Sequence, residues 1–344
     1  MSFSADSEIF HDARLNALKQ WLDSLSRHAV DSESIRPASS DASFRRYFRI
    51  DSARGSYIAM DAPPEKEKIQ PFIHVAEVFR QCAVCVPEII EQDAEQGFLL
   101  LSDLGATTYL QKLNHENAHE MYMDAIHALI RIQISSRSGI FQEYDRTLLL
   151  NELKLFPEWY VSRHLNVQLS EKQTAVLQKM FDLILANNMA QPQVYVHRDY
   201  HSRNLMALET DNPGILDFQD AVFGPITYDL VSLLRDAYIV WDEERVLDWA
   251  IRYWERARQA GLPVNPDIDM FYRDFEFMGL QRHLKVLGIF ARLYYRDGKE
   301  AYLNDLPVVM EYTYRTASRY PELAPLARLL DQLLQREIQA GYTF

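Results

Sequence analysis

The sequence is poor in cysteine and has no long apolar run. Its only cysteines, Cys82 and Cys85, form one C-x-x-C pair. A zinc site needs a second ligand pair, and the surroundings do not resemble a thioredoxin-like site, so we expect ordinary thiols in a reducing compartment. No stretch reaches the roughly eighteen consecutive apolar residues of a membrane span. The first fifteen residues carry three acidic side chains instead of a basic and an apolar segment, which favours a cytoplasmic protein.

Positive charge is also in short supply. The chain has 36 lysine and arginine residues against 49 aspartate and glutamate residues, a net charge of −13. This balance argues against a broad binding surface for nucleic acid or an anionic membrane, so neither is expected as a partner. With 344 residues, of which 48% are hydrophobic, the chain can bury a large core and exceeds the usual size of one domain. We therefore expect two lobes.

Two glycine-rich phosphate-binding motifs are missing. Neither G-x-x-x-x-G-K-[ST] nor G-x-G-x-x-G occurs among the 11 glycines, which excludes a P-loop and a dinucleotide-binding fingerprint. His197 and His201 have the spacing of a helical zinc pair, but the glutamate of H-E-x-x-H is absent and the context is a loop. A zinc hydrolase is therefore disfavoured, and we interpret His197 as a structural residue that braces the loop.

The first third of the chain predicts a small lobe rich in strands. Leucines at helical spacing predict an amphipathic helix within about the first thirty residues. Short β-like runs follow at 47–50, 56–60, 86–90 and 98–101, and a helical pattern at 72–79 interrupts them. The expected order is strand, strand, strand, helix, strand, strand.

After Gly105 the pattern becomes helical. Apolar residues between 121 and 132 share one helix face, and helical periodicity dominates to the end of the chain. The predicted fold class is α+β, with a small N-terminal lobe at 1–101 built on an antiparallel sheet and a larger, mainly helical C-terminal lobe at 106–344. We expect a short hinge at 102–105, because no long Pro/Gly/Ser linker is present.

The candidate chemistry centres on one loop. A brief β-like run at 194–196 leads into His197-Arg198-Asp199-Tyr200-His201-Ser202-Arg203-Asn204, which fits the pattern H-x-D-x-x-x-x-N. Phosphoryl transfer requires an acceptor hydroxyl held in line and a metal held on the phosphates. One tight loop can supply a carboxylate for the hydroxyl and an amide oxygen for the metal. Asp199 is therefore the candidate base and Asn204 the candidate metal ligand.

A second acidic motif follows in Ile215-Leu216-Asp217-Phe218-Gln219-Asp220. Two apolar residues predict a strand that delivers Asp217 beside the loop, where its carboxylate can bridge a metal to the β- and γ-phosphates. Either motif alone is weak evidence, but both in this order after a β-rich lobe favour a kinase-like site. The alternative is a structural turn in which Asp and Asn serve as caps.

These motifs resemble the aminoglycoside phosphotransferase and choline kinase superfamily over most of the chain, and that superfamily has a fold like that of protein kinases. Four segments look more closely like the bacterial N-acetylmuramate/N-acetylglucosamine anomeric kinases; they lie at 40–48, 60–64, 98–105 and 284–292. The resemblance implies a protein-kinase-like bilobal fold with ATP held between the lobes. It also implies an enzyme that uses ATP and magnesium (Mg²⁺) to phosphorylate the anomeric hydroxyl of a cell-wall amino sugar in peptidoglycan recycling.

The resemblance assigns roles by position. It makes Asp199 the base that contacts the acceptor, and Asn204 and Asp217 the magnesium ligands. The N-terminal lobe would bind the nucleotide. The expected nucleotide contacts are, for adenine at the hinge, Leu101, Ser102 and Leu104 and, for the phosphates in the segment 39–46, Ser43, Arg45 and Arg46.

The sequence departs from the protein-kinase pattern in its phosphate contacts. The phosphate-covering segment contains no glycine, and the strand that should carry V-A-I-K ends in Ile58-Ala59-Met60-Asp61, so the usual phosphate lysine is absent. Arg45, Arg46 or Arg49 could supply that charge, with Glu77 orienting one of them. The alternative is that these arginines are solvated surface charges.

Asp229 is expected to be structural. Only eleven residues separate it from Asp217 and no A-P-E follows, which leaves no room for a phosphorylatable activation segment and disfavours a protein kinase. Within Thr227-Tyr228-Asp229-Leu230 it resembles the buried acid that hydrogen-bonds the backbone of the catalytic loop. A buried carboxylate requires such partners.

A cationic stretch at 273–299 bears on the acceptor. A cationic helix suits an anionic sugar, such as one with a lactyl carboxylate, whereas polycationic aminoglycosides prefer acidic walls. The same charges also fit a solvated helix face. The predicted substrate contacts are Asp199, Arg203, Gln281 and Arg282. A drug-modifying aminoglycoside kinase and a nucleotide-binding pseudokinase stay open as alternatives.

Overall fold

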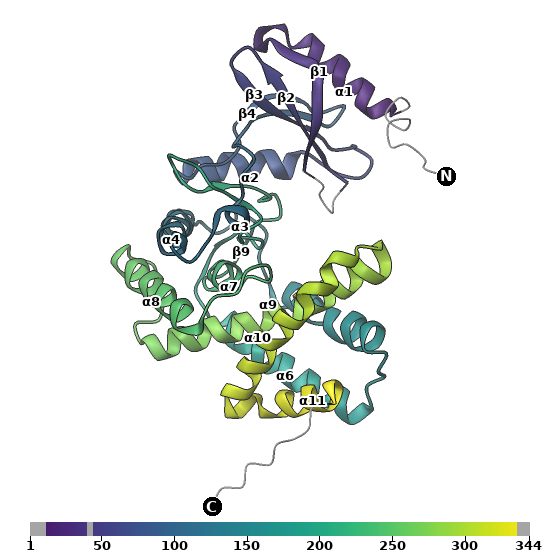
Figure 1. The fold of residues 1–344 in the computed structure, drawn as a ribbon. Coiled ribbons are helices and arrows are strands. Elements are labelled where there is room, and N and C mark those ends of the chain that lie inside the picture. The colour runs from purple at the N-terminus through teal and green to yellow at the C-terminus, as the bar shows by residue number, and fades with distance from the viewer. Residues whose placement is uncertain (1–11, 40–43, 336–344) are drawn as a thin grey trace, which may run out of the picture. The chain divides into compact units, whose positions relative to one another are not determined.

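The computed structural model describes residues 12–39 and 44–335, which form two compact units (Figure 1). The first combines the described residues up to Thr107 with Met206–Asp220. The second combines Thr108–Leu205 with the described residues from Ala221 onward. The boundaries expected from the sequence stay a prediction, and they did not include the return of residues 206–220 to the first unit.

The first unit is built on a five-stranded antiparallel sheet in the order β1-β2-β3-β5-β4. Its strands are β1 (Val30–Ser39), β2 (Arg46–Ser52), β3 (Gly55–Asp61), β4 (Ile89–Asp93) and β5 (Phe98–Ser102). Helix α2 (Gln70–Gln81) follows β3. The predicted order of strand, strand, strand, helix, strand, strand is therefore confirmed.

Two sequence predictions are wrong in extent. The strand expected at 86–90 begins only at Ile89, because Pro87 has no N–H for a sheet ladder and restricts the residue before it. The expected N-terminal helix is, within the described residues, only α1 (Ala13–Ser24). A short 3-10 turn follows it, and the chain then reverses at Ala29, whose φ is 48°, before it enters β1.

Helix α1 packs on the sheet (Figure 1). Apolar side chains of α1 and of three strands form one buried cluster, which consists of Leu18, Trp21, Leu22, Ile50, Ala59, Phe98 and Leu100. Helix α2 buries the apolar face that its sequence predicts. Its Phe72 and Phe79 rings contact Phe218 at centroid distances of 4.8 and 5.9 Å, which anchors the returning segment 206–220 to α2. That segment carries β8 (Gly214–Ile215), paired with β7 (Leu205–Met206).

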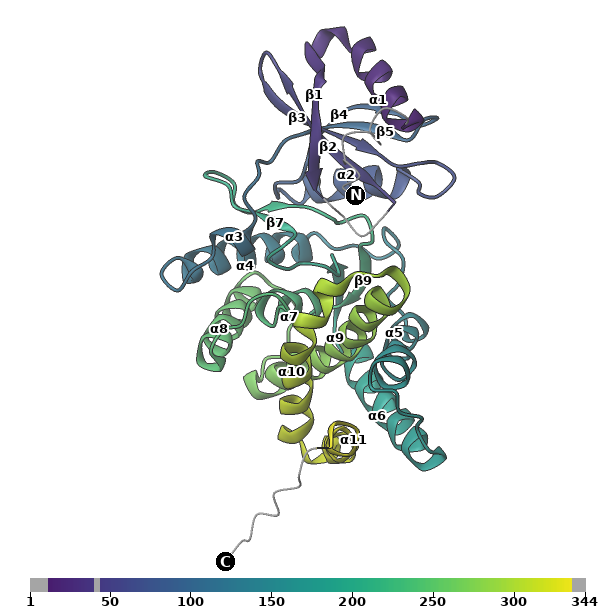
Figure 2. The same ribbon diagram turned by 45° about the vertical axis from the view of Figure 1, so that its right-hand side comes forward.

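The second unit is mainly helical, as predicted (Figure 2). Its α-helices are α3 (Tyr109–Lys112), α4 (Ala118–Ile134), α5 (Arg146–Leu153), α6 (Glu171–Met189), α7 (Tyr228–Leu234), α8 (Glu243–Gln259), α9 (Ile268–Asp297), α10 (Leu306–Arg319) and α11 (Ala324–Leu334). The π-helix η4 (Phe156–His164) and two short 3-10 helices, η5 (Glu300–Asp305) and η6 (Pro321–Leu323), complete it. One antiparallel pair, β6 (Gln193–Val196) with β9 (Val222–Pro225), leads into residues 197–204, hereafter the HxD loop.

Helix α9 runs through the second unit and contacts α6, α7, α10 and η4 (Figure 2). Its ends are well defined, because the Asp267 side chain accepts N–H bonds at the first turn and Gly298 adopts the left-handed conformation (φ 69°) at the last. Gly288 lets η4 approach closely, since a Cβ there would lie 2.4 Å from a backbone atom of Leu155. None of the helices in the described part of the chain combines the length and apolar character that a membrane crossing requires.

Candidate active site

The start of the HxD loop is held by a buried acid. The carboxylate of Asp229, in the first turn of α7, accepts hydrogen bonds from the backbone N–H groups of His197 (2.6 Å) and Arg198 (3.0 Å). Arg198 has a φ of 79°, an uncommon conformation for a residue with a side chain. The pair of hydrogen bonds stabilises this sharp turn, so the backbone that carries the next residue, Asp199, is fixed to α7.

A second acid holds the other part of the loop. Asp236, just after α7, accepts hydrogen bonds from the N–H (2.9 Å) and the hydroxyl (2.5 Å) of Ser202. Both acids are buried, and each uses its lone pairs on the loop or on neighbouring backbone. The HxD loop is therefore preorganised by two carboxylates that do not face solvent.

Asp199 lies between these two anchors. Its backbone N–H donates to Nδ1 of His197 (3.2 Å), and its backbone carbonyl accepts from Nδ2 of Asn204 (3.0 Å). The carboxylate itself is partly exposed and accepts no hydrogen bond from any residue that the structure describes. It is thus available for a hydroxyl group from outside the protein.

A buried cluster of charges lies next to the HxD loop. Glu152 of α5 accepts a hydrogen bond from Nη2 of Arg198 (2.6 Å) and pairs with Nζ of Lys285 from α9 (2.9 Å). The Tyr144 hydroxyl donates to the same carboxylate, and Lys285 also donates to the Tyr228 hydroxyl (2.9 Å). Burial raises the pKa of Glu152, but Lys285 and Arg198 outweigh burial and lower it below its ordinary value. The cluster therefore ties α5 and α9 to the loop through ionised groups.

The neighbouring cations also set the charge of Asp199. Burial alone would raise the pKa of its carboxyl group, but Lys285, His201 and Arg282 outweigh burial and lower the pKa to about 2. Asp229 differs, because burial raises its pKa to about 7 even though two backbone N–H groups favour its ionised form. Near neutral pH, Asp199 is an anion that can orient a hydroxyl and accept its proton.

The predicted acceptor contacts have very different surroundings. Gln281 has no exposed surface and donates to the Leu149 carbonyl (2.9 Å), so it cannot touch a bound sugar in this arrangement, and we leave it out of the proposed site. Arg203 is exposed, and its guanidinium lies 3.6 Å from the centre of the Tyr238 ring. Arg282 is 5% exposed and has no hydrogen-bonding or ion-pair partner among the described residues.

Asp217 belongs to the first unit. It follows β8 and adopts a left-handed backbone conformation with a φ of 60°. Nε2 of Gln219 donates to Oδ1 of Asp217 (2.8 Å), which orients the carboxylate. The roles of Asn204 and Asp217 as metal ligands stay predictions.

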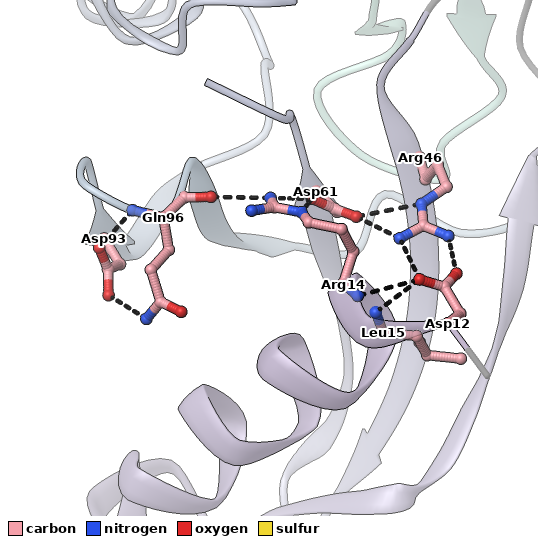
Figure 3. Close-up of polar contacts among 7 residues, drawn as sticks. All are labelled: Asp12, Arg14, Leu15, Arg46, Asp61, Asp93 and Gln96. Atoms are coloured by element: carbon pink, nitrogen blue, oxygen red, sulfur yellow. Dashed lines mark hydrogen bonds and ion pairs between the residues drawn. The ribbon is translucent and has the colours of Figure 1, made fainter. Parts of the chain in front are cut away.

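A carboxylate occupies the end of the strand in which the kinase pattern has its lysine (Figure 3). Asp61 is fully buried and accepts hydrogen bonds from Nε (3.0 Å) and Nη2 (2.5 Å) of Arg46 and from Nε of Arg14 (3.1 Å). Arg46 also pairs with Asp12, and Arg14 donates to the Gln96 carbonyl (2.7 Å). We call Asp12, Arg14, Arg46 and Asp61 the Asp61 cluster. The cluster binds α1 to the sheet, so Arg46 already has a structural role.

The other arginines considered for the phosphates have acidic neighbours too. Arg49 holds Asp103 through Nε (2.6 Å) and Nη2 (2.9 Å). Arg45 lies 3.9 Å from Glu67. Glu77 is exposed and pairs with no cation among the described residues, so the idea that it orients an arginine is not supported.

The segment expected to meet adenine is tied to β4. The N–H of Ser102 donates to the Glu88 carbonyl (2.9 Å), and its hydroxyl accepts from the Glu88 N–H (2.8 Å). Leu101 is buried, whereas Leu104 is partly exposed. Ser43, predicted near the phosphates, lies outside the described residues. The nucleotide contacts stay predictions.

The family of the chain follows from sequence comparison. A family model described as "Phosphotransferase enzyme family" matches residues 34–263, which include the HxD loop, Asp217 and Asp229. The chain belongs to this family. The match covers both acids that flank Asp199 and most of the second unit up to α8, so the loop described above is the catalytic loop of a phosphotransferase family.

Curated relatives match the chain over nearly its whole length. A protein of Neisseria meningitidis serogroup B named N-acetylmuramate/N-acetylglucosamine kinase is 49% identical over 95% of this chain and 98% of its own length. A protein of the same name from Pseudomonas aeruginosa is 47% identical over 94% of this chain and 98% of its own length. A third, from Caulobacter vibrioides, is 28% identical over 79% of this chain and 84% of its own length.

Solved structures support the fold. The choline kinase LicA from Streptococcus pneumoniae has a TM-score of 0.62 at 13% identity, covering 87% of this chain and 98% of that one. The aminoglycoside phosphotransferase APH(2'')-Ib, bound to ADP, has a TM-score of 0.56 at 14% identity, covering 89% of this chain and 99% of that one. At this identity the likeness concerns the fold alone, and the predicted protein-kinase-like α+β fold is confirmed.

Sequence reasoning missed Glu152 and the function of Lys285 as its partner. Glu152 sits in the helix segment Arg146–Leu153, where only its apolar neighbours hint at burial. Lys285 was noted merely as one cation of a basic stretch. A single acid in an otherwise apolar helix is a weak signal, because its cationic partners here lie 46 and 133 residues away along the chain.

Proposed function

We propose that this protein is a sugar kinase that transfers the γ-phosphoryl group of ATP to the anomeric hydroxyl of N-acetylmuramate and/or N-acetylglucosamine, giving the sugar 1-phosphate. The observation that carries the proposal is the carboxylate of Asp199, which is ionised, held by its backbone on both sides, and accepts no hydrogen bond within the described protein. The family supports phosphoryl transfer, and the names of the full-length relatives support the acceptor.

The proposed reaction is a direct transfer. The anomeric oxygen forms a bond to the γ-phosphorus while the bond to the β,γ-bridging oxygen breaks, and ADP leaves with that electron pair. Asp199 accepts a hydrogen bond from the hydroxyl before the transfer and receives its proton as the new bond forms. A carboxylate with a pKa of about 2 is a weak base, so we expect Asp199 to act mainly by positioning the hydroxyl, whose proton becomes more acidic during the transfer.

The nucleotide and metal contacts are proposed from the sequence pattern. Asn204 and Asp217 would hold magnesium, since amide and carboxylate oxygens suit this cation, which when bound would neutralise charge on the phosphates. The hydrogen bond from Nδ2 of Asn204 to the Asp199 carbonyl leaves the amide oxygen as the ligating atom. The remaining proposed contacts are Leu101, Ser102 and Leu104 for adenine and Ser43, Arg45 and Arg46 for the phosphates.

The biological setting is also a proposal. A kinase for cell-wall amino sugars would act in the cytoplasm during peptidoglycan recycling, because its phosphate donor is there. The net charge of −13 gives no support to a nucleic-acid partner.

An aminoglycoside kinase is the second candidate, because several solved structures with this fold are aminoglycoside phosphotransferases. The buried cations near Asp199 argue against it, since Arg282 and Lys285 would repel a polycationic acceptor. A pseudokinase gains some support from the missing lysine but has no use for the intact Asp199, Asn204 and Asp217.

A panel of acceptors tests the proposal. The protein with magnesium-ATP is offered N-acetylmuramate, N-acetylglucosamine, choline and kanamycin, and ADP release is measured for each. We expect release with at least one N-acetyl sugar and none above background with kanamycin. Turnover of kanamycin alone would favour the second candidate, and ATP binding without turnover of any acceptor would favour the pseudokinase.

A further inference from the structure

Arg282 is an unusual arginine because it is buried without a counter-ion. Its residue is 5% exposed, its Nε is buried without a partner, and no described residue forms a hydrogen bond or ion pair with it. A buried charge is costly unless it is paired, and such groups in proteins nearly always have partners. The arrangement therefore favours a state in which an anion from outside the protein contacts the guanidinium.

The surrounding contacts place Arg282 beside the catalytic loop. It lies on α9 one turn before Lys285, which is bound to Glu152 and through it to Arg198, the residue before Asp199. The next residue on α9, His283, contacts the Arg235 carbonyl at 3.3 Å, beside the acid that holds Ser202. Arg282 is thus bracketed by two connections from α9 to the loop.

The nearby carboxylates of the protein are already engaged. Glu152 has Arg198 and Lys285 as partners. Asp229 and Asp236 are committed to the backbone and hydroxyl groups that shape the catalytic loop. Asp199 is needed for the acceptor hydroxyl, and a direct pair with Arg282 is not formed. No acid near the loop is therefore left over for Arg282 among the described residues.

We infer that Arg282 binds the carboxylate of an anionic acceptor while the acceptor's hydroxyl is on Asp199. This inference rests on the proposed function. Of the two proposed sugars, N-acetylmuramate carries a lactyl carboxylate and N-acetylglucosamine does not, so Arg282 distinguishes them. A guanidinium matches a carboxylate through two parallel N–H donors, which lysine cannot reproduce. Arg203, stacked on Tyr238, is too exposed to compete for this role.

The test compares the two sugars in four proteins: the unsubstituted chain, Arg282→Gln, Arg282→Lys and Arg296→Gln. Arg296 lies on the same helix but is exposed and paired with Asp297, so its substitution serves as a control. We expect Arg282→Gln to lower kcat/KM for N-acetylmuramate about tenfold to hundredfold, mainly through KM, and to change kcat/KM for N-acetylglucosamine less than threefold. Arg282→Lys should recover only part of the loss, and Arg296→Gln should change neither value.

A change on the ligand sharpens the test. The neutral amide of the N-acetylmuramate carboxyl group should be as poor for the unsubstituted protein as N-acetylmuramate is for Arg282→Gln, with no further loss when both changes are combined. Equal losses for both sugars in a folded Arg282→Gln protein would overturn the inference, as would no loss for either. If the unsubstituted protein turns over neither sugar, the proposed function fails first and the inference fails with it.

Discussion

Two buried charges in this molecule have opposite surroundings. Asp61, in the first unit, has guanidinium groups of Arg14 and Arg46 on its carboxylate, and Asp12 balances the second of them. Arg282, in the second unit, is just as well buried but has no acidic partner among the described residues. The difference teaches that burial alone does not mark a functional charge. A charge whose partners are all supplied by the protein is structural, whereas one without them requires a ligand.

The largest expected effect concerns the ligand-facing side of this comparison. Asp199→Asn removes the charge that orients the acceptor hydroxyl but keeps the shape of the side chain. We expect kcat to fall about a hundredfold to ten-thousandfold, with nucleotide affinity unchanged when measured by calorimetry. Asp182→Asn, at an exposed acid paired with Arg146, is the control and should retain activity. Near-normal turnover in Asp199→Asn would mean that another group handles the hydroxyl.

The position of α9 keeps Arg282 beside the loop, and Gly288 tests how tightly that helix is held. Gly288→Ala places a methyl group 2.4 Å from the Leu155 backbone, so we expect a loss of about 3 kcal/mol in the free energy of unfolding. Gly279→Ala on the same helix meets nothing closer than 3.5 Å and should leave stability unchanged or raise it by up to about 1 kcal/mol. Urea unfolding measures both, and equal stability of the two variants would refute the close packing of α9 on η4.

The saturated Asp61 cluster should matter for stability and not for the acceptor. Asp61→Asn leaves two arginines without their anion, and we expect a loss of about 2 kcal/mol, below the value for fully buried pairs because each guanidinium keeps about a third of its side chain exposed. The control is Asp51→Asn, whose exposed pair with Arg36 should contribute less than about 1 kcal/mol. Chemical denaturation compares them. If Asp61→Asn also changed the ratio of kcat/KM for the two sugars, the division into structural and ligand-binding charges would be wrong.

The smallest expected effect is on the pH profile. Because the pKa of Asp199 is lowered to about 2, the carboxylate stays ionised throughout the range in which the protein is assayed. We expect kcat/KM at saturating magnesium-ATP to change less than twofold between pH 8 and about pH 5.5 on account of this group. The same shift stabilises the fold above the ordinary pKa of 3.8 and is lost as the pH falls toward 2. An acid limb near pH 6 that disappears in Asp199→Asn would contradict this assignment.

Local patterns in the sequence predicted much of the fold. The apolar face of α2 and the helix α4 follow from periodicity, and three strands of the sheet match their expected ranges closely. The start of β4 was misplaced because the apolar run around Pro87 outweighed the missing N–H. The extent of α1 was overestimated because its leucine spacing gives no sign of the turn at Ala29.

The candidate site was only partly predictable, for a physical reason. The spacing from His197 to Asn204 is local, so a motif can indicate it. The ion pair of Arg46 with Asp61 and the burial of Gln281 depend on which faces of distant elements meet, and periodicity does not determine that. Arg282 appeared as a candidate, but its lack of a partner became visible only with the structure.

Phosphorus NMR of the reaction product tests the central claim most directly. The protein is incubated with magnesium-ATP and either N-acetyl sugar, and the new resonance is examined for coupling to protons of the sugar. We predict a signal split by the single anomeric proton and absent when Asp199→Asn replaces the enzyme. A signal coupled to the methylene protons at carbon 6, or a spectrum with only ADP and inorganic phosphate, would contradict the account.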